Sequence, residues 1–214
     1  MTNNKTISAI VIVVVAIGLF AAFWPGNDDA QGGSVTSLKS SDWTRGAENP
    51  KVTLIEYGDF QCPACRVYEG VVEQLREEFK DTLSFGYRHF PLVQIHQNAL
   101  LSAKASEAAG LQGKFWEMHD ILYEKQSEWS DSTNGKEIFT GYAKNMSLDV
   151  VRFEKDLENS ELTKKIEADY REGLRIDVSA TPTFFVNGKK IKNPGSLEDF
   201  KKIIEKELSG SAAL

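Results

Sequence analysis

The chain of 214 residues is 41% apolar and 26% charged, which fits one globular domain with a short appendage. Its formal net charge is −6 and no dense run of basic residues occurs, so the composition argues against nucleic-acid binding.

The appendage is the N-terminal segment, where residues 7–24 are almost wholly apolar and carry no charged side chain. As a helix this stretch would be about 27 Å long, close to the hydrocarbon thickness of a bilayer. Lys5 precedes it, and Asp28 and Asp29 follow it, so the positive-inside rule keeps the N-terminus in the cytoplasm. We therefore predict a transmembrane anchor within residues 1–24, with the rest of the chain outside the cytoplasm.

Two other interpretations of this segment stay open. A cleaved signal peptide would have a shorter apolar core and a small-residue cleavage site, whereas this stretch ends in Phe23-Trp24-Pro25. A buried core helix is the remaining alternative. An anchor implies a single-pass protein of the cell membrane, whereas a cleaved signal implies a secreted protein. Both interpretations place the domain outside the cytoplasm, where disulfides persist. Residues 25–41, rich in small and polar residues, are predicted to form a flexible linker.

The folded domain is predicted to open with a β-α-β unit. A strand is expected over residues 52–57, a helix over residues 63–79 and a second strand over residues 83–89. Apolar residues four apart predict one buried face on that helix, made of Val67, Val71, Leu75 and Phe79.

A block of helices is predicted to follow, from residue 97 to about residue 174. It comprises an alanine-rich helix over residues 98–109, one near residues 115–122, one over residues 136–145, a short helix that Ser147 can cap, and one lined by Leu162, Ile166, Tyr170 and Leu174.

The chain is predicted to end as a β-β-α unit. Strands over residues 183–186 and 189–192 are joined by a two-residue Asn187-Gly188 turn. Ser196 and Asp199 have the spacing of a capping box at the start of a final helix.

Two cysteines, Cys62 and Cys65, are the only ones in the chain, and they lie between the first strand and the first helix. The backbone N–H groups and the dipole at a helix N-terminus favour a negative charge, so a reactive thiolate of low pKa is expected there. We predict that Cys62 is the exposed N-cap residue, that Pro63 takes the first helical position, and that Cys65 is more buried.

Two non-catalytic interpretations of the cysteines are weaker. A Cys62–Cys65 disulfide closes a very small ring, so it would remove little entropy from the unfolded chain. A zinc site usually needs four ligands, and the three histidines do not supply a tight ligand spacing. His89, His96 and His119 are therefore predicted to be structural or surface residues, and no metal or cofactor is expected.

Three stretches of the sequence together resemble the DsbA-like thiol-disulfide oxidoreductases of the thioredoxin superfamily, in the form that is anchored outside bacterial cells. The resemblance covers about residues 36–208 and rests on the combination of motifs, because Cys-x-x-Cys by itself is weak. The stretches are Glu56-Tyr57-Gly58-Asp59-Phe60-Gln61-Cys62-Pro63-Ala64-Cys65, Tyr87-Arg88-His89-Phe90-Pro91-Leu92 and Ala180-Thr181-Pro182-Thr183-Phe184-Phe185-Val186-Asn187-Gly188.

The resemblance implies an α/β thioredoxin fold in which a helical domain is inserted between a βαβ half and a ββα half, following the N-terminal transmembrane helix. The first half would then span residues 42–96, the helical insertion residues 97–175 and the second half residues 176–214.

The resemblance also implies roles for individual residues. Taken alone, a strand glutamate such as Glu56 is an ordinary surface residue, but the family places an acidic residue beneath the dithiol as a buried proton acceptor for Cys65. Thr181-Pro182 is expected to be a cis peptide that faces the dithiol, with the Thr181 backbone able to pair with an extended substrate. Strongly oxidising members carry Pro-His between the cysteines. The Pro63-Ala64 pair therefore predicts a milder oxidant.

The predicted function is an extracytoplasmic oxidase that introduces disulfides into reduced secreted or surface proteins. The family implies reoxidation by an integral-membrane partner of the DsbB type. Two alternatives remain: a reductase or isomerase with the opposite electron flow, and a non-enzymatic metal-binding module that keeps the scaffold.

Overall fold

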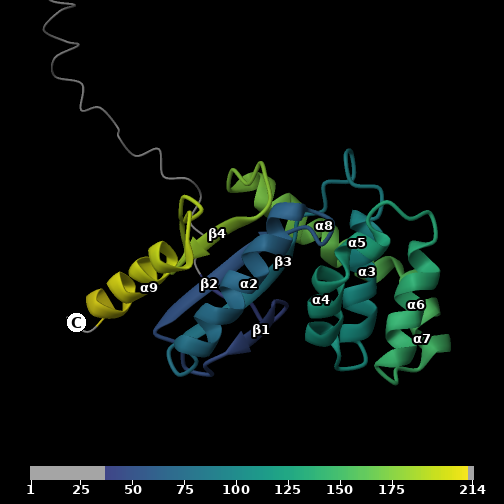
Figure 1. Ribbon diagram of the computed structural model, residues 1–214, viewed down its shortest axis with the longest axis horizontal. Coiled ribbons are helices and arrows are strands. Elements are labelled where there is room, and N and C mark those ends of the chain that lie inside the picture. The colour runs from purple at the N-terminus through teal and green to yellow at the C-terminus, as the bar shows by residue number, and fades with distance from the viewer. Residues whose placement is uncertain (1–36, 212–214) are drawn as a thin grey trace, which may run out of the picture. The chain divides into compact units, whose positions relative to one another are not determined.

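The computed structural model describes residues 37–211, in which helices surround one β-sheet (Figure 1). In chain order the elements are β1 (Trp43–Gly46), β2 (Val52–Gly58), α2 (Pro63–Glu78), β3 (Leu83–His89), α3 (Ala99–Gly110), α4 (Phe115–Glu124), α5 (Gln126–Trp129), α6 (Gly135–Asn145), α7 (Val150–Leu157), α8 (Ser160–Arg175), β4 (Thr183–Val186), β5 (Lys189–Lys190) and α9 (Leu197–Ser211).

The strands form one five-stranded sheet in the order β1-β3-β2-β4-β5. Strands β2 and β3 pair in parallel through the crossover helix α2, whereas the other neighbours are antiparallel. The helices α3 to α8 lie between β3 and β4 in the chain. This order confirms the predicted thioredoxin fold with a helical insertion between its βαβ and ββα halves.

The two faces of the sheet are distinguished by the alternation of side chains along each strand. Leu54 and Phe184 belong to the larger apolar core, together with residues of α2 and α9. Ile55 and Phe185 pack in a second cluster on the opposite face, where Tyr170 of α8 contributes. Glu56 has the same parity as Leu54 on β2, so its side chain is directed to the face that α2 covers.

The helices α3 to α7 gather beyond one end of α2 in Figure 1. Their junction with the sheet combines an aromatic stack and a polar cluster. The Trp43 ring of β1 stacks on Phe115 of α4, with centroids 4.6 Å apart. The carboxylate of Glu107 accepts from Trp43 Nε1 at 2.8 Å and contacts His89 Nε2 at 2.9 Å. The junction is therefore specified by directional contacts as well as by apolar burial.

The structure corrects three local predictions. Strand β1 was not predicted, because Trp-Thr-Arg-Gly shows no apolar alternation and forms a strand only by pairing with β3. Val67 was predicted to share a buried face with Leu75. Leu75 is buried as predicted, but Val67 is 71% exposed, and α2 buries Cys65 and Val72 beside Leu75. Ser147 has a positive φ of 61° and does not cap α7. The cap is Asp149, whose carboxylate accepts from Arg152 N.

The predicted membrane anchor and most of the linker lie outside the described residues. Among residues 37–211, no helix has the length and apolar character needed to cross a bilayer.

Replacing Phe184 by alanine should lower the free energy of unfolding by about 3–5 kcal/mol, because this fully buried ring packs between Tyr68 of α2 and Phe200 of α9. Val67→Ala is the matched control on the exposed side of α2 and should change stability by less than about 0.5 kcal/mol. Urea unfolding of the two variants measures both effects, and comparable losses would contradict this assignment of the core.

Candidate functional site

The dithiol lies at the start of α2, as the sequence predicts. Cys62 is the N-cap residue, with extended φ and ψ of −70° and 121°, and Pro63 begins the helix. Cys65 lies within the first turn and is 0% exposed. Both cysteines are free thiols. Cys62 is only 7% exposed, so the expectation of an exposed thiol is wrong: tertiary neighbours cover a residue that the local helix would leave open.

One of these neighbours is the loop before β4. The Thr181–Pro182 peptide is cis, as the family resemblance implies. The carbonyl oxygen of Thr181 lies 3.3 Å from Cys62 Sγ. The buried Thr181 hydroxyl has no nitrogen or oxygen partner among residues 37–211. The loop therefore presents both a carbonyl and a hydroxyl at the sulfur.

Hydrogen bonding lowers the pKa of Cys62 to about 5. The largest cause is the Cys65 thiol, which donates to the Cys62 sulfur; burial opposes the shift, and the Thr181 side chain and the backbone N–H groups of Ala64 and Cys65 add to it. The position at a helix N-terminus supplies those backbone donors. At neutral pH the first cysteine is a thiolate, which is the reactive form.

Burial dominates the pKa values of the two groups behind Cys62 and raises both of them. Desolvation raises the pKa of Cys65 well above its ordinary value, and its hydrogen bond to Cys62 and the nearby Glu56 add to this. Desolvation likewise raises the pKa of Glu56, with repulsion from Glu69 as the second cause, while the facing Cys65 thiol partly offsets the shift. Neither carboxyl oxygen of Glu56 has a nitrogen or oxygen partner within the described part of the chain. The predicted buried position of Glu56 beneath the dithiol is therefore found, and its carboxyl is protonated more readily than usual.

Three polar side chains that the sequence did not single out hold the loop before Cys62. Gln126 Nε2 of α5 donates to the carbonyls of Phe60 and Cys62, at 2.7 and 3.0 Å. Asp59 accepts from Gln61 N at 2.8 Å and contacts His96 Nδ1 at 2.7 Å.

Gln61 joins this loop to the helical block. Its amide donates to Ser130 O at 2.8 Å and accepts from Asn98 N at 2.7 Å. Asp59 and Gln61 stand in the motif beside the cysteines, which is a usable sequence signal, whereas Gln126 is 64 residues away and has none.

Each of the three histidines lies beside a carboxylate. His89 pairs with Glu107, His96 with Asp59 at 2.7 Å, and His119 with Asp120 at 2.8 Å. All three histidines were predicted to be structural or surface residues; His89 and His119 are buried, so neither is a surface residue. None of these contacts involves a cysteine.

A sequence profile of the family described as thioredoxin matches residues 39–206. The chain belongs to the thioredoxin family. Oxidised BdbD from Bacillus subtilis superposes with a TM-score of 0.74 at 25% identity, over 84% of this chain and 99% of that one. Wolbachia pipientis alpha-DsbA1 superposes with a TM-score of 0.74 at 19% identity, over 83% and 96% of the two chains. The fold is therefore that of the DsbA-like thiol-disulfide oxidoreductases, as the motifs predicted.

Curated proteins of similar sequence carry another name. The Na⁺/H⁺ antiporter NhaA 1 of Mycolicibacterium gilvum is 38% identical over 168 residues, which are 77% of this chain and 26% of that protein. The protein of the same name from Salinispora arenicola is 36% identical over 170 residues, 79% of this chain and 25% of that protein. The chain thus spans about a quarter of the length of these relatives, and the antiport in their names refers to the longer proteins.

Alkylation of the reduced chain should follow the ionisation of Cys62, with a midpoint near the pKa of about 5. Because this pKa lies below that of an unfolded thiol, the thiolate stabilises the reduced fold fully above the unfolded pKa, and the contribution is lost as the pH falls towards about 5. Iodoacetamide rates against pH measure the midpoint. Cys65→Ala should raise it, since the Cys65 thiol is the largest cause of the shift; an unchanged midpoint would contradict this.

Gln126→Ala should cost about 1–3 kcal/mol of unfolding free energy, because it leaves the buried carbonyls of Phe60 and Cys62 without their donor. Gln74→Ala is the control, since its exposed amide donates only to Gly70 O of the same helix, and it should cost less than about 0.5 kcal/mol. Chemical denaturation measures both, and equal stabilities would show that Gln126 does not support the loop.

Proposed function

We propose that this protein is an extracytoplasmic thiol-disulfide oxidase that introduces disulfides into reduced secreted or surface proteins. The observation that carries the proposal is the contrast between the acidic Cys62 thiol and the buried Cys65 thiol. A stabilised thiolate favours the reduced form of the dithiol, and an enzyme whose reduced form is stabilised is a strong oxidant. The Pro63-Ala64 pair lacks a histidine that could add to this effect, so the oxidant is milder than the Pro-His members of the family.

The reaction begins with the oxidised enzyme, in which Cys62 and Cys65 form a disulfide. A substrate thiolate attacks Cys62 Sγ, the Cys62–Cys65 bond breaks, and its electron pair stays on Cys65. A second substrate thiolate then attacks the substrate sulfur of the mixed disulfide, and Cys62 leaves as a thiolate. The substrate departs with a disulfide, and the two electrons remain on the enzyme dithiol.

Glu56 supplies the proton that this sequence needs. Burial keeps its carboxyl protonated more readily than usual, and Cys65 becomes basic when it leaves the disulfide. Transfer of the proton from Glu56 to the Cys65 sulfur moves the single negative charge from the sulfur to the carboxylate, so Cys65 leaves as a neutral thiol. The same carboxylate takes the proton back when the dithiol is reoxidised.

The carbonyl of Thr181 lies 3.3 Å from Cys62 Sγ, which supports a substrate backbone that pairs beside the dithiol. An extended segment that pairs with Thr181 as an added strand would present its thiolate to Cys62. The reduced enzyme passes its electrons to an integral-membrane partner of the DsbB type. Residues 1–24 tether the domain on the extracytoplasmic side of the cell membrane, or direct its secretion if they are cleaved.

Cys62→Ser should abolish oxidation of a dithiol peptide, because no sulfur remains for the substrate to attack. Cys65→Ser should accumulate the mixed disulfide at Cys62, because the reversing thiol is gone. Both are measured by non-reducing gel electrophoresis and peptide turnover. Normal turnover by Cys62→Ser would refute the assignment.

The direction of electron flow is tested by equilibrium of the full-length chain with glutathione. An oxidase should have a potential less negative than about −200 mV, the upper end of the glutaredoxin range. A value near that of thioredoxin, about −270 mV, would identify a reductase. Thiol alkylation of intact cells provides an independent test, with a mostly disulfide state expected.

A further inference from the structure

A second cluster of chemically active side chains lies beyond the dithiol on α2. Glu69 is one helical turn after Cys65 and faces His119 and Asp120 of α4, with one donor atom of each within 4.8 Å of the others. The His119 side chain is 0% exposed, and its Nε2 is 3.9 Å from Glu69 Oε2. This distance is too long for a hydrogen bond, and neither atom has another partner in the described part of the chain. Two buried polar atoms therefore face each other unsatisfied.

The contact of His119 Nδ1, the other ring nitrogen, indicates the tautomer of the imidazole. His119 Nδ1 lies 2.8 Å from Asp120 Oδ1, so Nδ1 donates its proton to the carboxylate. In the neutral ring this leaves the lone pair on Nε2, directed towards Glu69 Oε2. A histidine that binds a metal through one nitrogen usually donates from the other nitrogen to a carboxylate or carbonyl. The separation of 3.9 Å exceeds the roughly 3.3–3.6 Å between two donors of a tetrahedral ion bound at about 2.0–2.2 Å, so the two groups would approach by a few tenths of an ångström on binding.

Arg45 holds the outer side of the same carboxylates. Its Nη2 is 2.8 Å from Glu69 Oε1, and its Nη1 is 2.9 Å from Asp120 Oδ1. The guanidinium packs over the Trp116 ring at 4.3 Å, which fixes its position. Arg45 thus orients both carboxylates and leaves Glu69 Oε2 as the oxygen without a donor.

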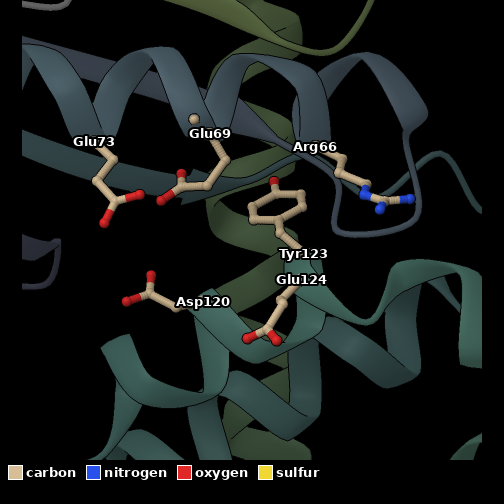
Figure 2. A pocket seen from close by; sticks show the side chains of 7 residues that line it. Arg66, Glu69, Glu73, Asp120, Tyr123 and Glu124 are labelled. Carbon is tan, nitrogen blue, oxygen red and sulfur yellow. The ribbon is translucent and has the colours of Figure 1, made fainter.

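Glu69 and Asp120 line a pocket of about 400 Å³, whereas His119 is buried and is not part of the lining (Figure 2). In Figure 2 the carboxylates of Glu69, Glu73 and Asp120 lie on one side of the pocket, while the guanidinium of Arg66 extends away from them. Glu124 is a further acidic residue of the lining. Arg45 and Arg76 also lie beside these acidic groups, so the four carboxylates face three arginines and exceed them by one charge.

We propose that this cluster binds a divalent transition ion of the zinc type. Glu69 Oε2 and His119 Nε2 are the protein ligands, Asp120 orients the imidazole, and Glu73 and water complete the coordination from the pocket. An imidazole ligand selects transition ions over Ca²⁺ and Mg²⁺, which prefer oxygen donors. The proposed ion site contains neither cysteine, so the proposal does not depend on the direction of electron flow through the dithiol.

The test is titration of Zn²⁺ into the full-length chain that carries both Cys62→Ser and Cys65→Ser, so that no thiolate competes for the ion. Calorimetry should show one Zn²⁺ per chain. In this background Glu69→Gln should weaken binding at least tenfold, and Asp120→Asn by about 10–100-fold, since it orients a ligand. Glu117→Gln is the control: Glu117 is an exposed residue of α4 that pairs with Lys114, and its substitution should leave the affinity unchanged.

Imidazole ¹⁵N spectra provide a readout that needs no substitution in the cluster. The chain has three histidines, and Zn²⁺ should shift Nε2 of His119 while His89 and His96 stay unchanged. Absence of binding, binding that survives Glu69→Gln, or a His119 that carries protons on both nitrogens in saturating Zn²⁺ would each overturn the proposal. The last result would identify a charged His119–Glu69 pair instead. Displacement of Zn²⁺ by millimolar Mg²⁺ would also contradict it.

Discussion

The hydrogen bond from the Cys65 thiol to the Cys62 sulfur is the interaction on which the chemistry of this protein depends. It is the largest cause of the low pKa of Cys62, and it contributes to the high pKa of Cys65. One contact therefore separates the proton affinities of two thiols that stand three residues apart. The helix start supplies further donors to the first sulfur, and the sheet beneath desolvates the second.

The inserted helices stabilise the loop that positions Cys62. The loop before Cys62 has no regular structure of its own, and its carbonyls are satisfied by Gln126 from α5. Gln61, a residue of the loop itself, forms hydrogen bonds with Ser130 and Asn98 in the helical block. The block is thus part of the reactive centre as well as a cover for it, because buried backbone groups need partners and a four-residue loop cannot supply them.

Ionisable side chains continue from the dithiol along one face of α2. Cys65 and Glu69 are four residues apart, and the charge of Glu69 already contributes to the raised pKa of Glu56. The redox centre and the Glu69–His119–Asp120 cluster are therefore coupled electrostatically through Glu69. A cation in that cluster would reduce the repulsion that Glu69 exerts on Glu56, which links the proposed ion site to the proton that the thiol chemistry moves.

Local signals in the sequence were sufficient for much of this description. The spacing of Cys62 and Cys65 between a strand and a helix predicted an N-capping thiol, because helix ends have the same backbone chemistry in every protein. The β-α-β and β-β-α halves followed from periodicity and turn residues. The buried Glu56 and the cis Thr181–Pro182 peptide followed from the family resemblance, since neither is visible in spacing alone.

What the tertiary structure decided was every property that needs a distant partner. Strand β1 exists because β3 offers it an edge, and Val67 is exposed because the helix buries Cys65 and Val72 together with the predicted Leu75. The burial of Cys62, the support from Gln126 and the facing of His119 and Glu69 all join segments far apart in the chain. A sequence records what each residue can do, but desolvation and hydrogen bonding depend on which residues meet, and only the fold determines that.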